Sequence, residues 1–139
     1  RVPQIGETMN WIIAKIKWIM LVSGALTCTL LYAAIAPQAA LLSMFGATLE
    51  GTLAEIIVRN WGALIGLVGA MQIYGAFKPQ SRSLILTVGS ISKLLFVGLI
   101  LMYGRQYLDK AGIAIAIDLV FVVLFIGYFV GMWRKQRST

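Results

Sequence analysis

Two ionisable residues interrupt the apolar runs of this sequence and give its best indication of chemistry. Lys93 lies near the middle of the apolar run 83–103, and Asp118 lies in the next run, 113–133. A charge that deep in a bilayer costs about 2.5–3.5 kcal/mol or more unless it is paired or hydrated. Three roles fit such residues: a polar clasp between helices, a functional polar cavity, or contact with a partner chain or a lipid headgroup.

The depths of the charges along their runs decide which pairs can form. Asp118 stands about five residues into its run, whereas Lys93 is deeper. Side chains lean toward the N-terminus of their own helix, so in antiparallel helices these two would lean apart. The spacing therefore favours Arg59 as the neighbour of Asp118, with a Lys93–Asp118 pair, either direct or bridged by a water or hydroxyl, as the alternative. The predicted intramembrane polar network comprises Arg59, Asn60, Gln72, Lys93 and Asp118.

The elements that position these residues are membrane-spanning helices. The chain is 60% hydrophobic and 12% charged, whereas a soluble domain is about a quarter charged. Its apolar residues gather into runs of about 20, the length that crosses a bilayer as a helix. We predict an all-α integral membrane four-helix bundle, a single transmembrane domain over residues 1–139. Its predicted spans are 18–36, 53–77, 83–103 and 113–133.

The segments between these spans are predicted from their composition. Residues 38–51 are apolar but too short to cross, so we expect an interfacial segment between the first two helices. Thr52 and Glu55 have the spacing of a capping box, which predicts a helix that begins at Leu53. Residues 105–112 are predicted to form a loop. The chain begins with Arg1, and its first span is predicted to be a retained helix and not a signal peptide.

Small residues at helical spacing predict close helix packing. Gly62, Gly66 and Ala70 repeat every four residues, with Gly69 alongside, and Gly127 and Gly131 have the same spacing near the end of the last span. Such faces let helix backbones approach one another in a bilayer. The sequence leaves open whether they pack within this chain or against another.

The net charge of +7 is explained by topology and not by nucleic-acid binding. With four spans, the termini and the turn 78–82 share one side. That side carries eight basic residues, Arg1, Lys15, Lys17, Lys78, Arg82, Arg134, Lys135 and Arg137, against Arg59, Arg105 and Lys110 on the other. This bias predicts an integral membrane protein with both termini in the cytoplasm.

The sequence contains few of the residues and motifs that enzymes use for catalysis. It has one cysteine and no histidine, so a Cys/His metal site has no ligand set. No nucleophile elbow, phosphate-binding loop or dinucleotide fingerprint is present. We therefore expect neither an enzyme nor a metal site.

Four segments together resemble a known family: Val58-Arg59-Asn60-Trp61-Gly62, Ala76-Phe77-Lys78-Pro79, Gly89-Ser90-Ile91-Ser92-Lys93 and Ile115-Ala116-Ile117-Asp118-Leu119-Val120-Phe121. They are similar to small four-span bacterial membrane proteins of unknown function, of the DoxX-like type. The resemblance covers roughly residues 31–128 and implies a four-helix bundle in a bacterial inner membrane, with no established activity. It marks Arg59, Asn60, Lys93 and Asp118 as its polar positions.

Two functional hypotheses follow. The first is a non-catalytic accessory or structural subunit that packs in a larger membrane complex. The alternative is a small oligomeric transporter or ligand-binding bundle that uses Lys93 and Asp118. The expected partners are the lipid bilayer and other membrane subunits or a second copy, without nucleic acid. No cofactor is predicted, although a bound lipid or pigment is compatible with either hypothesis.

Overall fold

The computed structural model describes residues 5–137, which form helices and turns without a strand. The helices are α1 (Ile5–Cys28), α2 (Leu31–Ile35), α3 (Pro37–Phe45), α4 (Thr52–Phe77), α5 (Arg82–Tyr103) and α6 (Leu108–Arg137), with short 3-10 turns η1 (Pro79–Ser81) and η2 (Arg105–Tyr107). Four helical stretches within the described residues are long and apolar enough to cross a membrane. The prediction of an all-α bundle of four long apolar helices is therefore confirmed.

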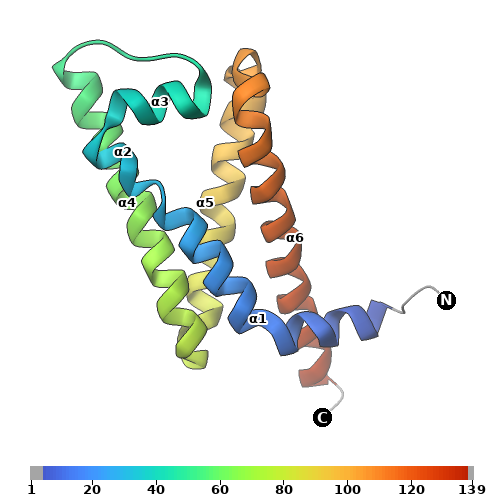
Figure 1. Ribbon diagram of the computed structural model, residues 1–139. Coiled ribbons are helices and arrows are strands. Elements are labelled where there is room, and N and C mark those ends of the chain that lie inside the picture. The colour runs from blue at the N-terminus through green and yellow to red at the C-terminus, as the bar shows by residue number, and fades with distance from the viewer. Residues whose placement is uncertain (1–4, 138–139) are drawn as a thin grey trace.

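The helices form two layers that diverge from one end of the molecule (Figure 1). Helices α1 and α2 pack along α4 in one layer, and α5 packs along α6 in the other. The layers meet at the end that holds both termini. The core there contains Ile16, Met20, Leu86 and Phe125, all nearly or fully buried.

Helix α3 spans the opposite, wider end of the bundle (Figure 1). Its nine residues begin at a proline, which suits the first turn because that position needs no amide donor. Its last residue, Phe45, contacts both layers and the η2 turn, with ring-centroid distances of 6.4 Å to Trp61, 6.4 Å to Phe96 and 5.8 Å to Tyr107. The predicted short segment between the first two spans is thus a helix that bridges the layers.

Glycines on α4 allow the tight contact with α1 and α2. A Cβ atom on Gly62 would lie 2.7 Å from the Cβ of Ala33, and one on Gly69 would lie 2.7 Å from the amide nitrogen of Cys28. Gly66 lies directly against Leu31. These glycines pack within the chain.

The prediction that Ala70 continues this face is corrected by the structure. Ala70 is exposed, and Gly69 takes its place. Gly69 follows Gly62 by seven residues, nearly two turns of a helix with 3.6 residues per turn, so the two lie on the same face. Ala70 follows Gly62 by eight residues and lies beyond that face. In the other layer, Gly127 and Gly131 lie against Ile12 and Ile13 of α1.

Two helix boundaries in the first half of the chain differ from the prediction. The polar lead-in is helical from Ile5 onward, and the first span is interrupted after Cys28. There the amides of Thr29 and Leu30 bond to the carbonyls of Leu26 and Thr27, three residues back. This tighter turn replaces the regular α-helical bonds and separates α1 from α2. Arg1, which is counted among the basic residues of the side that holds the termini, lies outside the described residues.

The capping-box prediction at the start of α4 is wrong. Thr52 is the first residue of the helix and Gly51 occupies the cap position, with no side-chain cap bond. Gly51 has φ of 102°, a backbone conformation that glycine adopts without steric cost. The amide of Glu55 bonds to the carbonyl of Gly51 at 3.1 Å, so the helical bond begins one residue earlier than predicted.

Candidate functional site

Lys93 of α5 and Asp118 of α6 form a direct ion pair inside the bundle. The Lys93 Nζ donates to Asp118 Oδ1 at 2.8 Å. Lys93 is 9% exposed, and the Asp118 side chain is 21% exposed. The pair joins the two helices of one layer.

The pair forms because both residues lie at the same level. The predicted loop 105–112 is in fact the short turn η2, and α6 already begins at Leu108. Lys93 therefore stands ten residues before the end of α5 at Tyr103, and Asp118 stands ten residues after the start of α6. The longer loop predicted from the sequence placed Asp118 too close to the start of its helix.

Arg59 is not the neighbour of Asp118, and this prediction is corrected. Its Nη1 donates to the carbonyl oxygens of Ala34 at 2.6 Å and Ile35 at 3.1 Å. Those carbonyls end α2, where a helix leaves acceptors without partners. Arg59 thus caps α2, and its exposed neighbour Asn60 forms no hydrogen bond with the described residues of the predicted network.

Gln72 of α4 is fully buried, and neither atom of its amide group has a hydrogen-bond partner in the described part of the chain. It lies against Gly89 of α5, where a Cβ atom would come within 2.8 Å of the Gln72 Nε2. Buried polar atoms are usually paired with protein or with ordered water. The unpaired amide of Gln72 is therefore a candidate binding group.

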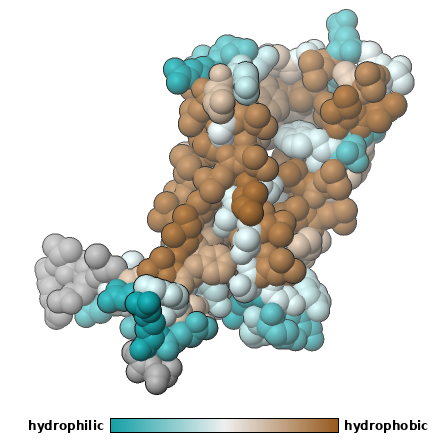
Figure 2. All heavy atoms as spheres, turned by 180° about the vertical axis from the view of Figure 1, so that it is seen from behind, coloured by the Kyte–Doolittle hydropathy of each residue, from teal (hydrophilic) through white to brown (hydrophobic). Residues whose placement is uncertain are grey.

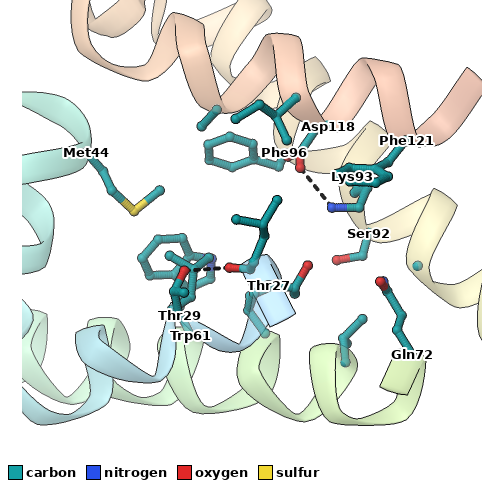
Figure 3. Close-up of a pocket in the computed structure, with 17 residues that line it drawn as sticks. Thr27, Thr29, Met44, Trp61, Gln72, Ser92, Lys93, Phe96, Asp118 and Phe121 are labelled. Atoms are coloured by element: carbon teal, nitrogen blue, oxygen red, sulfur yellow. Dashed lines mark hydrogen bonds and ion pairs between the residues drawn. The ribbon is translucent and has the colours of Figure 1, made fainter. Parts of the chain in front are cut away.

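A cavity of about 280 Å³ lies between the two layers and brings Gln72, Lys93 and Asp118 to one space (Figure 3). Residues from all four long helices line it, together with Met44 of α3 and the α1–α2 break. The lining residues are Leu26, Thr27, Thr29, Leu30, Met44, Trp61, Ile65, Val68, Gln72, Gly89, Ser92, Lys93, Phe96, Ala114, Ile117, Asp118 and Phe121. Figure 2 shows the molecule hollowed between two apolar columns, with paler side chains inside the hollow.

The cavity has a polar side and an aromatic side. In Figure 3, Gln72, Ser92 and Lys93 point toward the same part of the space, and Trp61 and Met44 lie across from them. The Lys93 Nζ also lies 5.6 Å from the centre of the Phe121 ring. Such a lining can hold an apolar body and bind a polar group at one end.

The broken helix is part of the same site. Thr27, Thr29 and Leu30 line the cavity, and the Thr29 hydroxyl donates to the carbonyl of Leu26. Thr27 donates to the carbonyl of Ser23 at 2.7 Å. Interrupted helices within membrane proteins occur where the backbone borders protein or a cavity.

The cavity holds few groups suited to covalent chemistry. Among the residues that line it, Asp118 is the single carboxylate, and Lys93 is engaged with it. In the described part of the chain, no group of three or more His, Cys, Asp or Glu residues could hold a metal ion. The arrangement is suited to binding.

Sequence reasoning missed the aromatic side of this site. Phe96 follows Lys93 by three residues and Phe121 follows Asp118 by three, a spacing that places side chains on one helix face. That spacing could have associated them with the charged pair. The contribution of Trp61 and Met44 depends on how the layers diverge, which no local pattern shows.

The chain matches no family model, no curated protein and no solved structure. The DoxX-like resemblance stays a prediction.

Proposed function

We propose that this protein is a non-enzymatic intramembrane binding bundle that holds a small, mainly apolar molecule between its two helix layers. The observation that carries this proposal is the cavity of about 280 Å³ that reaches Gln72, Lys93 and Asp118. Ligand sites in proteins are typically apolar cavities of about 300–1,000 Å³ with a few convergent polar groups. A volume just below that range suits one small molecule or the head region of a lipid.

The accessory-subunit hypothesis loses part of its support. It was motivated by the small size of the chain, the absence of catalytic motifs and the small-residue faces. Of these, the faces are used within the chain, because Gly62, Gly66, Gly127 and Gly131 all lie against its own helices. They are not free to pack against a partner. The hypothesis stays a prediction, and nothing in the cavity requires a second chain.

Retention of a bound molecule during purification tests the proposal. The protein is extracted in mild detergent and analysed by native mass spectrometry for co-purifying small molecules. Ala114→Phe fills the cavity, because Ala114 lines it, whereas Ala70→Phe adds the same bulk on an exposed face of α4. We expect bound mass in the unaltered protein and in Ala70→Phe, and loss of it in Ala114→Phe. Equal retention in both variants, or none in any folded sample, contradicts the proposal.

A further inference from the structure

We infer that the molecule held in this cavity is a neutral lipid-like compound whose polar group is a hydroxyl or an amide, and not a fatty acid or an amine. This inference rests on the proposed function and deepens it. It is drawn from the charge balance of the cavity and from the unpaired amide of Gln72.

The charges that line the cavity already cancel. Lys93 and Asp118 are the ionisable residues among those that line it, and they are paired at 2.8 Å. A carboxylate or an ammonium ligand would bring a third charge into this apolar space, where no other ionisable residue of the lining could balance it. An unpaired charge buried in this way is strongly unfavourable. A neutral ligand leaves the pair intact.

The hydrogen-bonding groups around the pair require a ligand that both donates and accepts. The Gln72 amide offers two donors on Nε2 and an acceptor on Oε1, and none of these has a partner within the described residues. Lys93 has three ammonium donors, of which Asp118 accepts one. A hydroxyl or amide satisfies both kinds of group, whereas a simple alkyl chain leaves them unpaired.

The apolar part of the ligand can extend toward the bilayer. Leu26 of α1 and Ile117 of α6 line the cavity and are 46% and 39% exposed, so we place its rim at these two residues. Below this rim α1 and α6 touch at Ile12 and Gly127, and above it Phe45 closes the wide end against Tyr107. A chain leaving the polar side therefore passes between helices into the hydrocarbon region.

Quenching of Trp61 fluorescence by brominated probes tests the inference. Trp61 lines the cavity, and the variant Trp11→Phe, Trp18→Phe, Trp133→Phe leaves it as the single tryptophan. In lipid nanodiscs at neutral pH it is titrated with a terminally brominated medium-chain alcohol, and with the amide, carboxylic acid and amine of the same chain length. We expect saturable quenching by the alcohol and the amide, with an apparent affinity about tenfold above that of the acid and the amine, because the ionised acid and amine would bring an unbalanced charge into the cavity.

Gln72→Leu provides the matched variant, with Gln106→Leu as the control because Gln106 lies in the exposed η2 turn. Gln72→Leu should lower the affinity for the alcohol and the amide about tenfold and leave the acid and the amine unchanged. Tighter binding of the acid or the amine, or equal saturable binding of all four probes, overturns the inference while the binding function stands. The order of the four apparent affinities, measured on the protein that keeps Gln72, decides this even if Gln72→Leu does not fold. Quenching that never saturates, for any probe, overturns the proposed function as well.

Discussion

At the scale of single residues, the cost of the buried charges explains why Lys93 and Asp118 lie together. Both belong to helices that are long and apolar enough to cross a membrane, where an isolated charge is unfavourable. Their contact at 2.8 Å is a charge-assisted hydrogen bond, which is stronger than one between neutral groups. Neither member of the pair forms a hydrogen bond with Gln72, whose amide stays unpaired in the described structure.

The energetic coupling of this pair is measurable by a double-mutant cycle. Lys93→Met leaves Asp118 without its partner and should cost ~3–5 kcal/mol of stability, the usual cost of breaking a buried pair. Adding Asp118→Asn removes the stranded carboxylate, so the double variant should be more stable than Lys93→Met alone. Thermal unfolding in detergent measures both, with Lys78→Met as an exposed control. Strictly additive losses in the cycle contradict direct coupling.

At the scale of elements, the apolar runs predicted the ends of α4 and α5 to within one residue but missed the starts of α1 and α6. The apolar runs indicated four spans because burial in lipid demands about 20 apolar residues. The start of α6 was missed because Leu108 and its neighbours include Asp109 and Lys110, whose polarity resembles a loop although they occupy the first helical turn. Because the predicted helix began five residues too late, Asp118 was placed too close to its start, and Arg59 was wrongly favoured as its neighbour.

Close packing between α1 and α4 predicts opposite effects for two glycine substitutions. Gly69→Ala places a methyl group 2.7 Å from both the Cys28 nitrogen and the Gly24 oxygen, so backbone must shift. Overpacking of this kind typically costs about 1–3 kcal/mol. Gly98→Ala in α5 meets nothing within 4 Å and should stabilise the helix by about 0.4–1 kcal/mol. Unfolding midpoints measured side by side should fall for Gly69→Ala and rise for Gly98→Ala; a shift of the same sign in both would argue against the glycine contact.

At the scale of the whole molecule, the divergence of the two helix layers creates the cavity. The layers meet in the core around Phe125 and are held apart at the other end by Phe45 of α3. No sequence pattern encodes that angle, because it arises from contacts between residues far apart in the chain. The sequence could therefore predict the charged pair as a functional candidate but not the space that joins it to Gln72 and Trp61.

The arrangement of the ends also determines how the molecule should sit in a membrane. Both termini and the η1 turn lie at one end, and η2 lies at the other (Figure 1). Basic residues are more numerous at the first end, so we predict that this end faces the cytoplasm. The prediction is tested with single cysteines in a Cys28→Ala background, which removes the one native thiol.

Gln80→Cys and Gln106→Cys place thiols at exposed positions in η1 and η2. A membrane-impermeant maleimide added from outside the membrane that holds the protein should label Gln106→Cys, and should label Gln80→Cys only after that membrane is opened. Four spans put η1 and η2 on opposite sides of the bilayer, while the bias in basic residues decides which side is which. The reverse labelling pattern would overturn the orientation and leave the four spans intact. Labelling of both positions from outside would contradict the span between them, α5.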